Sequence, residues 1–122
     1  MTDRPPSTLL WVRSPPFSTV HLAESIRLAA MATALGETVR FLFVAEGVRA
    51  VVPGPEPFRY GPPIAKSLAG IVTPERPALV HGPSLARRGL DPGALRFDVP
   101  VAIVDDAEAA RWVVRCGKVV PL

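Results

Sequence analysis

Short apolar runs alternate with helical patterns along almost the whole chain, and this alternation constrains the fold more than any other feature. Strands of this kind, apolar on both faces, are typical of a parallel sheet that helices cover on both sides. We therefore predict an α/β fold: a single three-layer domain with a five-stranded, mainly parallel sheet in flavodoxin-like order. The five runs that we expect to be strands are 8–12, 38–44, 77–80, 99–104 and 118–120.

Helical patterns separate these runs. The first has two apolar rows, one of them formed by Leu28, Met31 and Leu35, so we expect this helix to pack on the sheet and also against something else. The last is amphipathic and begins after a cap provided by Asp105 or Asp106. The helices that we expect cover residues 20–35, 63–71, 84–88 and the segment from the Asp105-Asp106 cap to Cys116.

Length and composition indicate one domain with an aliphatic core. The chain has 122 residues, of which 48% are hydrophobic and only 7% aromatic, so we expect one domain over residues 1–122. Within it we expect a flexible tail at 1–6 and a proline-laced surface loop at 53–63. The mean hydropathy of +0.27 indicates more apolar surface than one subunit hides, which favours an oligomer.

Charge and cysteine content exclude several classes of function. The net charge is +3 and the basic residues are scattered, so we expect no direct binding of nucleic acid. The single Cys116 excludes an internal disulfide and a Cys-rich zinc site, and neither histidine has a partner at metal-binding spacing. We therefore expect no metal and no cofactor. The sequence has no secretory signal and no run near the ~20 apolar residues of a membrane span, so we expect a cytoplasmic protein without membrane contact.

The most informative candidate site is the turn after the third expected strand, because ligands of α/β sheets gather at the carboxyl ends of strands. Gly82 permits close backbone approach, and the following helix would direct its positive end toward His81 and keep the imidazole neutral. The alternative is a turn histidine satisfied by a local carbonyl. We expect His81, Gly82, Ser84 and Arg88 to line one wall of a binding cleft, with Phe17 and Ser18 on the opposite wall.

Other polar residues have simpler explanations. Arg87 and Arg88 could hold an anion or an acidic partner, or form a solvated helix end. Helix capping accounts for Asp105 and Asp106, and nothing in the spacing of Ser, His and Asp places them as a catalytic triad. Cys116 falls on the buried face of the last helix, which favours a core residue over a nucleophile.

Residues 14–18 (SPPFS), 41–54 and 84–91 (SLARRGLD), in this order along the chain, resemble segments of the DsrE/DsrF/TusC-like sulfur-relay family, most closely its DsrF/TusC branch. Residues 41–48 (FLFVAEGV), followed by 51–54 (VVPG), resemble a strand, acidic residue-Gly-Val and apolar pair-Pro-Gly segment of that family. Residues 84–91 (SLARRGLD) resemble its Ser-Leu-x-x-Arg-Gly-Leu-Asp segment, and residues 14–18 (SPPFS) resemble the turn after its first strand. The order of the expected elements agrees with the family over nearly the whole chain.

The resemblance implies a DsrE-like domain that acts in cytoplasmic persulfide transfer. Members work in hetero-oligomers that pass sulfur toward 2-thiouridine of tRNA or take part in sulfur oxidation. For this chain we expect homologous DsrE-fold subunits as partners, in a homo- or hetero-oligomer, and a sulfur-carrier protein as a further candidate partner. Counting back from Gly89 to the place of the family's persulfide-carrying cysteine gives His81, and imidazole cannot carry a sulfane sulfur. Ser18 also stands where the family usually has Gly.

We therefore expect a non-catalytic subunit of a sulfurtransferase complex, without its own sulfur-carrying thiol. It would support a partner that has the thiol, or bind a small ligand at the cleft around His81. Two alternatives stay open. One is a self-sufficient sulfurtransferase that uses an exposed, reactive Cys116, and the other is a homo-oligomeric structural or ligand-binding protein without chemistry.

Overall fold

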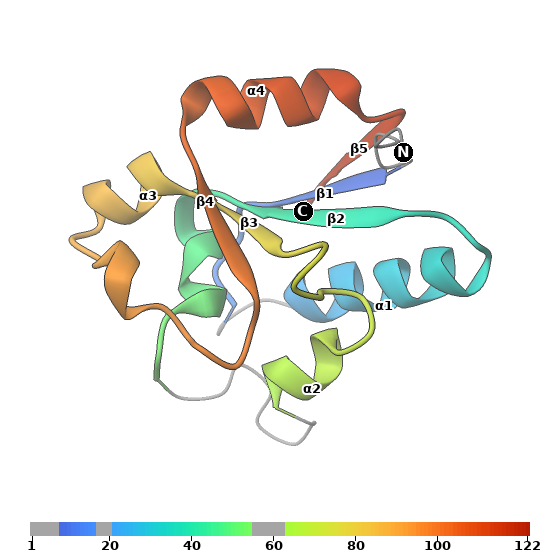
Figure 1. Ribbon diagram of the computed structural model, residues 1–122, viewed down its shortest axis with the longest axis horizontal. Helices are drawn as coiled ribbons and strands as arrows, with labels where there is room; N and C mark the ends of the chain where they lie inside the picture. Colours follow the sequence, from blue (N-terminus) through green and yellow to red (C-terminus); the bar gives the residue numbers. More distant parts are fainter. Residues whose placement is uncertain (1–7, 17–20, 55–62) are drawn as a thin grey trace.

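Five parallel strands form a single sheet in the order β4-β3-β2-β1-β5, with helices on both faces (Figure 1). The predicted three-layer α/β fold with a five-stranded sheet is thereby confirmed. The computed structural model describes residues 8–16, 21–54 and 63–122. The predicted tail at 1–6 and residues 55–62 of the predicted surface loop lie outside these ranges. The elements are β1 (Thr8–Val12), α1 (His21–Ala34), β2 (Val39–Phe43), the 3₁₀ helix η1 (Ala45–Val51), α2 (Ile64–Leu68), β3 (Ala78–His81), α3 (Gly82–Arg87), the 3₁₀ turn η2 (Pro92–Ala94), β4 (Val101–Val104), α4 (Asp106–Arg115) and β5 (Lys118–Pro121).

Alternate residues of the strands point into two separate apolar layers. Phe41 and Phe43 of β2 lie in the layer that also holds buried residues of α1, η1, α2 and α3, and their rings stack with centroids 5.7 Å apart. Leu9, Leu42 and Leu79 point to the other face, where α4 covers them. Since the central strands are buried on both faces, their sequences are mostly apolar rather than alternating, with Arg40 of β2 as an exception.

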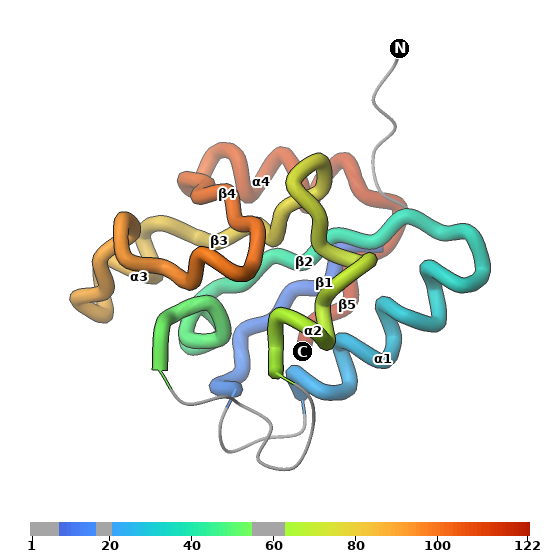
Figure 2. Tube along the Cα trace, turned by 60° about the horizontal axis from the view of Figure 1, so that its bottom comes forward, coloured from blue at the N-terminus to red at the C-terminus, as the bar shows by residue number. Residues whose placement is uncertain are grey.

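Of the helices in the described ranges, α4 alone covers its face of the sheet (Figure 2). β4 and β5 lie at opposite edges, so α4 has to cross the sheet to connect them. The connection that follows β3 therefore goes to one face, and the connection that follows its neighbour β4 goes to the other. Such a divergence between adjacent strand ends leaves a crevice at the carboxyl edge, which is where open α/β sheets bind ligands.

A capping box starts α4 at the end of β4. The Asp105 carboxylate accepts a hydrogen bond from the Glu108 amide (2.8 Å), and the Glu108 side chain accepts one from the Asp105 amide (3.3 Å). Of the two candidate caps, Asp105 is therefore the one that caps the helix. The neighbouring Asp106 is the first residue of α4, and its carboxylate is available for another contact.

α3 begins earlier than the sequence pattern predicts. The prediction started this helix at Ser84, whereas it starts at Gly82. Pro83 fits in the first turn because the amide that proline lacks has no partner inside a helix at that position. The early start brings Ser84 within one turn of His81.

The outer face of α1 leaves apolar side chains uncovered. Leu28, Met31 and Leu35 are 43%, 58% and 80% exposed, whereas Leu22 and Ala29 on the inner face are buried. Gly36, with φ at +85°, lies just after this helix in the left-handed conformation that commonly ends helices. The second partner expected for this helix is not provided by the described residues.

The end of the chain is fixed to the carboxyl edge of β1. The Leu122 amide donates to the Trp11 carbonyl (2.8 Å), and the Ser14 hydroxyl donates to the Leu122 carbonyl (2.8 Å). These bonds extend the pairing of β5 with β1 by one residue.

Among the described residues, no helix is long and apolar enough to span a bilayer.

Candidate ligand pocket

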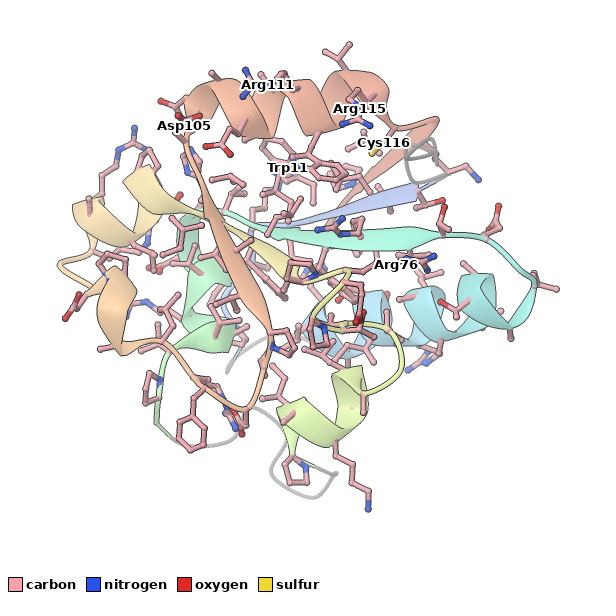
Figure 3. The ribbon with its side chains drawn as sticks, viewed as in Figure 1. Trp11, Arg76, Asp105, Arg111, Arg115 and Cys116 are labelled. Carbon is pink, nitrogen blue, oxygen red and sulfur yellow. The ribbon has the colours of Figure 1, made fainter. Side chains whose placement is uncertain are left out.

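A cavity of about 590 Å³ opens at the carboxyl edge of the sheet, under α4. Its lining combines a polar end, to which β3, α3 and α4 contribute, with an apolar wall. Figure 3 shows Trp11 beneath α4, with Asp105 at the start of that helix. The apolar lining includes Trp11, Val44, Ala109, Ala110, Val113 and Val114, and the polar lining comprises Arg13, His81, Ser84, Arg87 and Asp106.

A chain of short hydrogen bonds crosses the polar end of the pocket. His81 Nδ1 lies 2.6 Å from Ser84 Oγ, and His81 Nε2 lies 2.6 Å from Asp106 Oδ1. The Ala45 amide donates to the same Ser84 Oγ at 2.9 Å. The chain therefore joins the turn after β2, the first turn of α3, the end of β3 and the first turn of α4.

These contacts assign the protons of a neutral His81. The Asp106 carboxylate can only accept, so His81 Nε2 carries the proton and donates it. Nδ1 is then the acceptor, and the Ser84 hydroxyl donates to it while accepting from the Ala45 amide. Both ring nitrogens are thus occupied, and the side chain of His81 is only 11% exposed. A ligand that takes a hydrogen bond from His81 has to displace Asp106, whose side chain is 78% exposed.

The Ser-His-Asp connectivity, which the sequence spacing did not indicate, differs from that of a hydrolytic triad. Ser84 is 2% exposed, and its oxygen already accepts a backbone hydrogen bond. A nucleophilic serine has to present this oxygen to a substrate carbon. We therefore interpret Ser84 and Asp106 as residues that position His81.

The turn after β2 brings the Ala45 amide to Ser84. Ala45 has φ at +50°, a conformation that is uncommon for residues with a Cβ. Gly47 follows closely, and a Cβ on it would lie 2.0 Å from the carbonyl oxygen of Val12. η1 can therefore pack against the end of β1 only with glycine at this position.

Arg88 and Arg87, which are adjacent in sequence, have different surroundings. Arg88 donates to the Glu46 carboxylate (3.0 Å) and to the Ser84 carbonyl (3.0 Å), so it braces α3 against η1. Hydrogen bonds from Arg49 and Arg88 lower the pKa of Glu46. Arg87 lines the pocket instead, as does Arg13 from the end of β1.

Neither Arg13 nor Arg87 has a hydrogen bond or ion pair within the described part of the chain. The carboxylate of the lining, Asp106, is bound to His81. The pocket therefore carries unneutralised positive charge beside an apolar wall. Within the described ranges, no group of His, Cys, Asp and Glu residues could hold a metal ion.

Cys116 is not among the residues that line this pocket. It follows the last turn of α4 (Figure 3) and packs in the apolar layer under that helix. Burial raises the pKa of its thiol, and the positive charges of Arg115 and Arg40 offset this only in part. The Arg40 guanidinium stacks on Trp112 nearby, 4.5 Å from the ring centroid.

No protein-family model matches the sequence, and no curated protein sequence matches it significantly. Among solved structures, the crystal structure of the ychN protein from E. coli matches with a TM-score of 0.76 and 22% sequence identity. The match covers 96% of this chain and 99% of that chain, so the likeness extends over the whole sheet. The ychN protein has a DsrE-like fold.

The chain has a DsrE-like fold. In this DsrE-like domain, two of the expected cleft residues, His81 and Ser84, line the pocket and contact each other. Gly82 lies against β4, where a Cβ would be 3.2 Å from the Ile103 side chain. Arg88 points to Glu46 as described above, and the expected opposite wall, Phe17 and Ser18, lies outside the described residues.

Sequence reasoning missed Asp106, Trp11 and Arg13 as pocket residues. The signal for Asp106 was present, since it follows the expected strand 99–104 as His81 follows the expected strand 77–80. Residues at the carboxyl ends of neighbouring parallel strands meet, but the sequence alone does not show that β3 and β4 are neighbours.

Proposed function

We propose that this chain is a subunit of a cytoplasmic sulfur-relay assembly that provides a binding pocket for a persulfide but has no sulfur-carrying thiol of its own. One observation carries the proposal. His81, which stands where the resemblance places the persulfide-carrying cysteine, lies in the pocket at the carboxyl end of β3. The resemblance and the strand-end pocket thus point to the same place.

The pocket suits the chemistry of sulfane-sulfur transfer. In such a step an acceptor thiolate R′–S⁻ attacks the outer sulfur of R–S–SH, the S–S bond breaks, R–S⁻ leaves, and R′–S–SH is formed. No electrons are gained or lost overall, so no redox cofactor is needed. Arg13 and Arg87 would stabilise the thiolate or persulfide anion, and the apolar wall would accommodate the polarisable sulfur.

The partners in this proposal are homologous DsrE-fold subunits that carry the thiol, further copies of this chain, and a sulfur-carrier protein. The relay would serve thiolation of tRNA or sulfur oxidation. The exposed row on α1, formed by Leu28, Met31 and Leu35, is the apolar surface that such an assembly would bury.

Cys116 does not fit the carrier role. It lies partly buried beyond the last turn of α4, away from His81, and its raised pKa keeps the thiol protonated. The self-sufficient transferase that would use this thiol is therefore the less favoured alternative.

Restoring a thiol at position 81 tests the proposal. We expect the His81→Cys variant, incubated with glutathione persulfide, to gain a sulfur atom at that residue, as read by mass spectrometry of its peptides. The matched control is Ala86→Cys, which places a thiol on exposed α3 outside the pocket. Equal loading of the two introduced cysteines would contradict a sulfur-relay pocket.

The unmodified chain provides the complementary test. With thiosulfate or glutathione persulfide as donor and cyanide as acceptor, we expect no difference in thiocyanate formation between the unmodified chain and Cys116→Ser. Thiocyanate formation that depends on Cys116 would establish the alternative and overturn our proposal.

A further inference from the structure

We propose that the pocket binds a small organic anion whose charged head lies between Arg13 and Arg87 and whose apolar body lies against Trp11 and Val113. This inference names the class of molecule that occupies the pocket. It rests on the proposed function for the choice of pocket. Its test measures ligand binding and does not depend on sulfur transfer, so the two proposals can be overturned separately.

The charge of the lining selects an anion. Arg13 and Arg87 line the pocket and form no ion pair within the described ranges. Asp106, the one carboxylate among the described lining residues, accepts a hydrogen bond from His81 at 2.6 Å. A bound anion would therefore provide the counter-charge that the fold leaves out, and a neutral or cationic head would not.

The walls select an apolar body. Trp11, Val44 and Val113 lie on the same side of the sheet as α4, and Ala110 and Val114 continue this surface along the helix. Burial of apolar ligand surface against such walls is the main source of affinity for small molecules. An inorganic anion or a charged head alone would leave this surface in water.

The size of the pocket selects a small molecule. A volume of about 590 Å³ is within the range of roughly 300–1,000 Å³ that is usual for small-molecule sites. His81 does not select the ligand through a hydrogen bond, because Ser84 and Asp106 occupy both of its ring nitrogens. The arginines are thus left to recognise the head, and they accept a persulfide, thiosulfonate, sulfonate or carboxylate alike.

Four probe molecules separate the contributions of the anionic head and the apolar body to the binding affinity. Benzenethiosulfonate and benzenesulfonate have the anionic head and the apolar body, with and without a sulfane sulfur. Methyl phenyl sulfone has the body without the charge, and methanesulfonate has the charge with hardly any body. We expect both aryl anions to bind by calorimetry, and the other two to bind at least about tenfold more weakly.

Trp11 reports whether binding occurs in the pocket. The chain has two tryptophans, so in Trp112→Phe the emission comes from Trp11 alone. We expect benzenesulfonate to shift this emission with the same affinity that calorimetry gives, and this binding to weaken with salt.

Variants of the lining have matched controls on α4. Arg13→Gln combined with Arg87→Gln should weaken benzenesulfonate by about tenfold or more, whereas Arg111→Gln, outside the pocket, should not. Ala110→Leu should fill the pocket and reduce the affinity for benzenesulfonate, whereas Ala107→Leu, also exposed on α4 but outside the pocket, should leave it unchanged.

Three outcomes would overturn the inference: no binding of benzenesulfonate at millimolar concentration, equal affinity for the neutral sulfone, or no effect of the paired arginine substitutions. If benzenesulfonate binds as expected while His81→Cys takes up no sulfur, the anion pocket stands and the sulfur-relay role falls. If only the sulfur uptake is seen, the relay stands and the small-anion inference falls.

Discussion

At the residue scale, the Ser84 hydroxyl joins segments that are distant in sequence. It accepts a hydrogen bond from the Ala45 amide at 2.9 Å and donates one to His81 Nδ1 at 2.6 Å. The other ring nitrogen of His81, Nε2, binds the Asp106 carboxylate. The hydroxyl is buried, so water cannot replace it when it is lost. Removing it leaves both the amide and the ring nitrogen without a partner.

We predict that Ser84→Ala lowers the free energy of unfolding by about 1–3 kcal/mol, measured by urea denaturation. The control is Ser67→Ala on α2, whose exposed hydroxyl donates to the Pro63 carbonyl at 3.1 Å and should contribute less than about 0.5 kcal/mol. Equal losses for the two variants would mean that the hydrogen bonds of Ser84 add nothing beyond those of a surface serine.

At the scale of elements, the start of α4 separates a structural carboxylate from a pocket carboxylate. Asp105 caps the helix, and Asp106, one residue later, binds His81. The two residues are chemically identical and adjacent. Their different contacts come from their positions at the junction of β4 and α4, where Asp105 is the N-cap and Asp106 is the first residue of the helix.

We predict different effects for the two aspartates. Asp105→Ala should destabilise the protein by about 1 kcal/mol through the loss of the cap, without changing the tautomer of His81. Asp106→Ala should change the tautomer balance of His81, measured by the nitrogen chemical shifts of the ring, because Nε2 loses its acceptor. An unchanged tautomer in Asp106→Ala would contradict the proton assignment given above.

At the scale of the whole molecule, the sheet order places the pocket and the exposed row of α1 on opposite layers. α4 crosses the sheet above the pocket, and α1 packs on the other face. Association through Leu28, Met31 and Leu35 would therefore leave the face of α4 accessible.

We predict that replacing both Leu28 and Met31 by lysine lowers the mass of the particle in solution, measured by light scattering, because two buried charges cannot be accommodated in an apolar contact. The control is the double variant Ala30→Lys with Ala34→Lys, exposed on the same helix but outside this row. A monomeric unmodified chain, or equal dissociation in both double variants, would contradict assembly through this surface.

Much of the architecture could be predicted from the sequence, because buried parallel strands and an amphipathic final helix leave strong local patterns. The turn that holds His81 and Ser84 was found in the same way. Asp106 could not be assigned to the pocket, since its contact depends on which strands are neighbours. The position of Arg88 depends on Glu46, which comes from a distant segment of the chain.

The anchoring of Leu122 has a practical consequence for handling the protein. Its amide and carbonyl are bound to Trp11 and Ser14, so any peptide appended after Leu122 leaves the molecule beside Trp11, a residue of the pocket lining. An affinity tag there would add its own charges and bulk to every titration. β1 starts at the amino ends of the parallel strands, opposite the carboxyl ends that hold the pocket. Purification tags and fluorophores for these measurements should therefore be placed before Thr8.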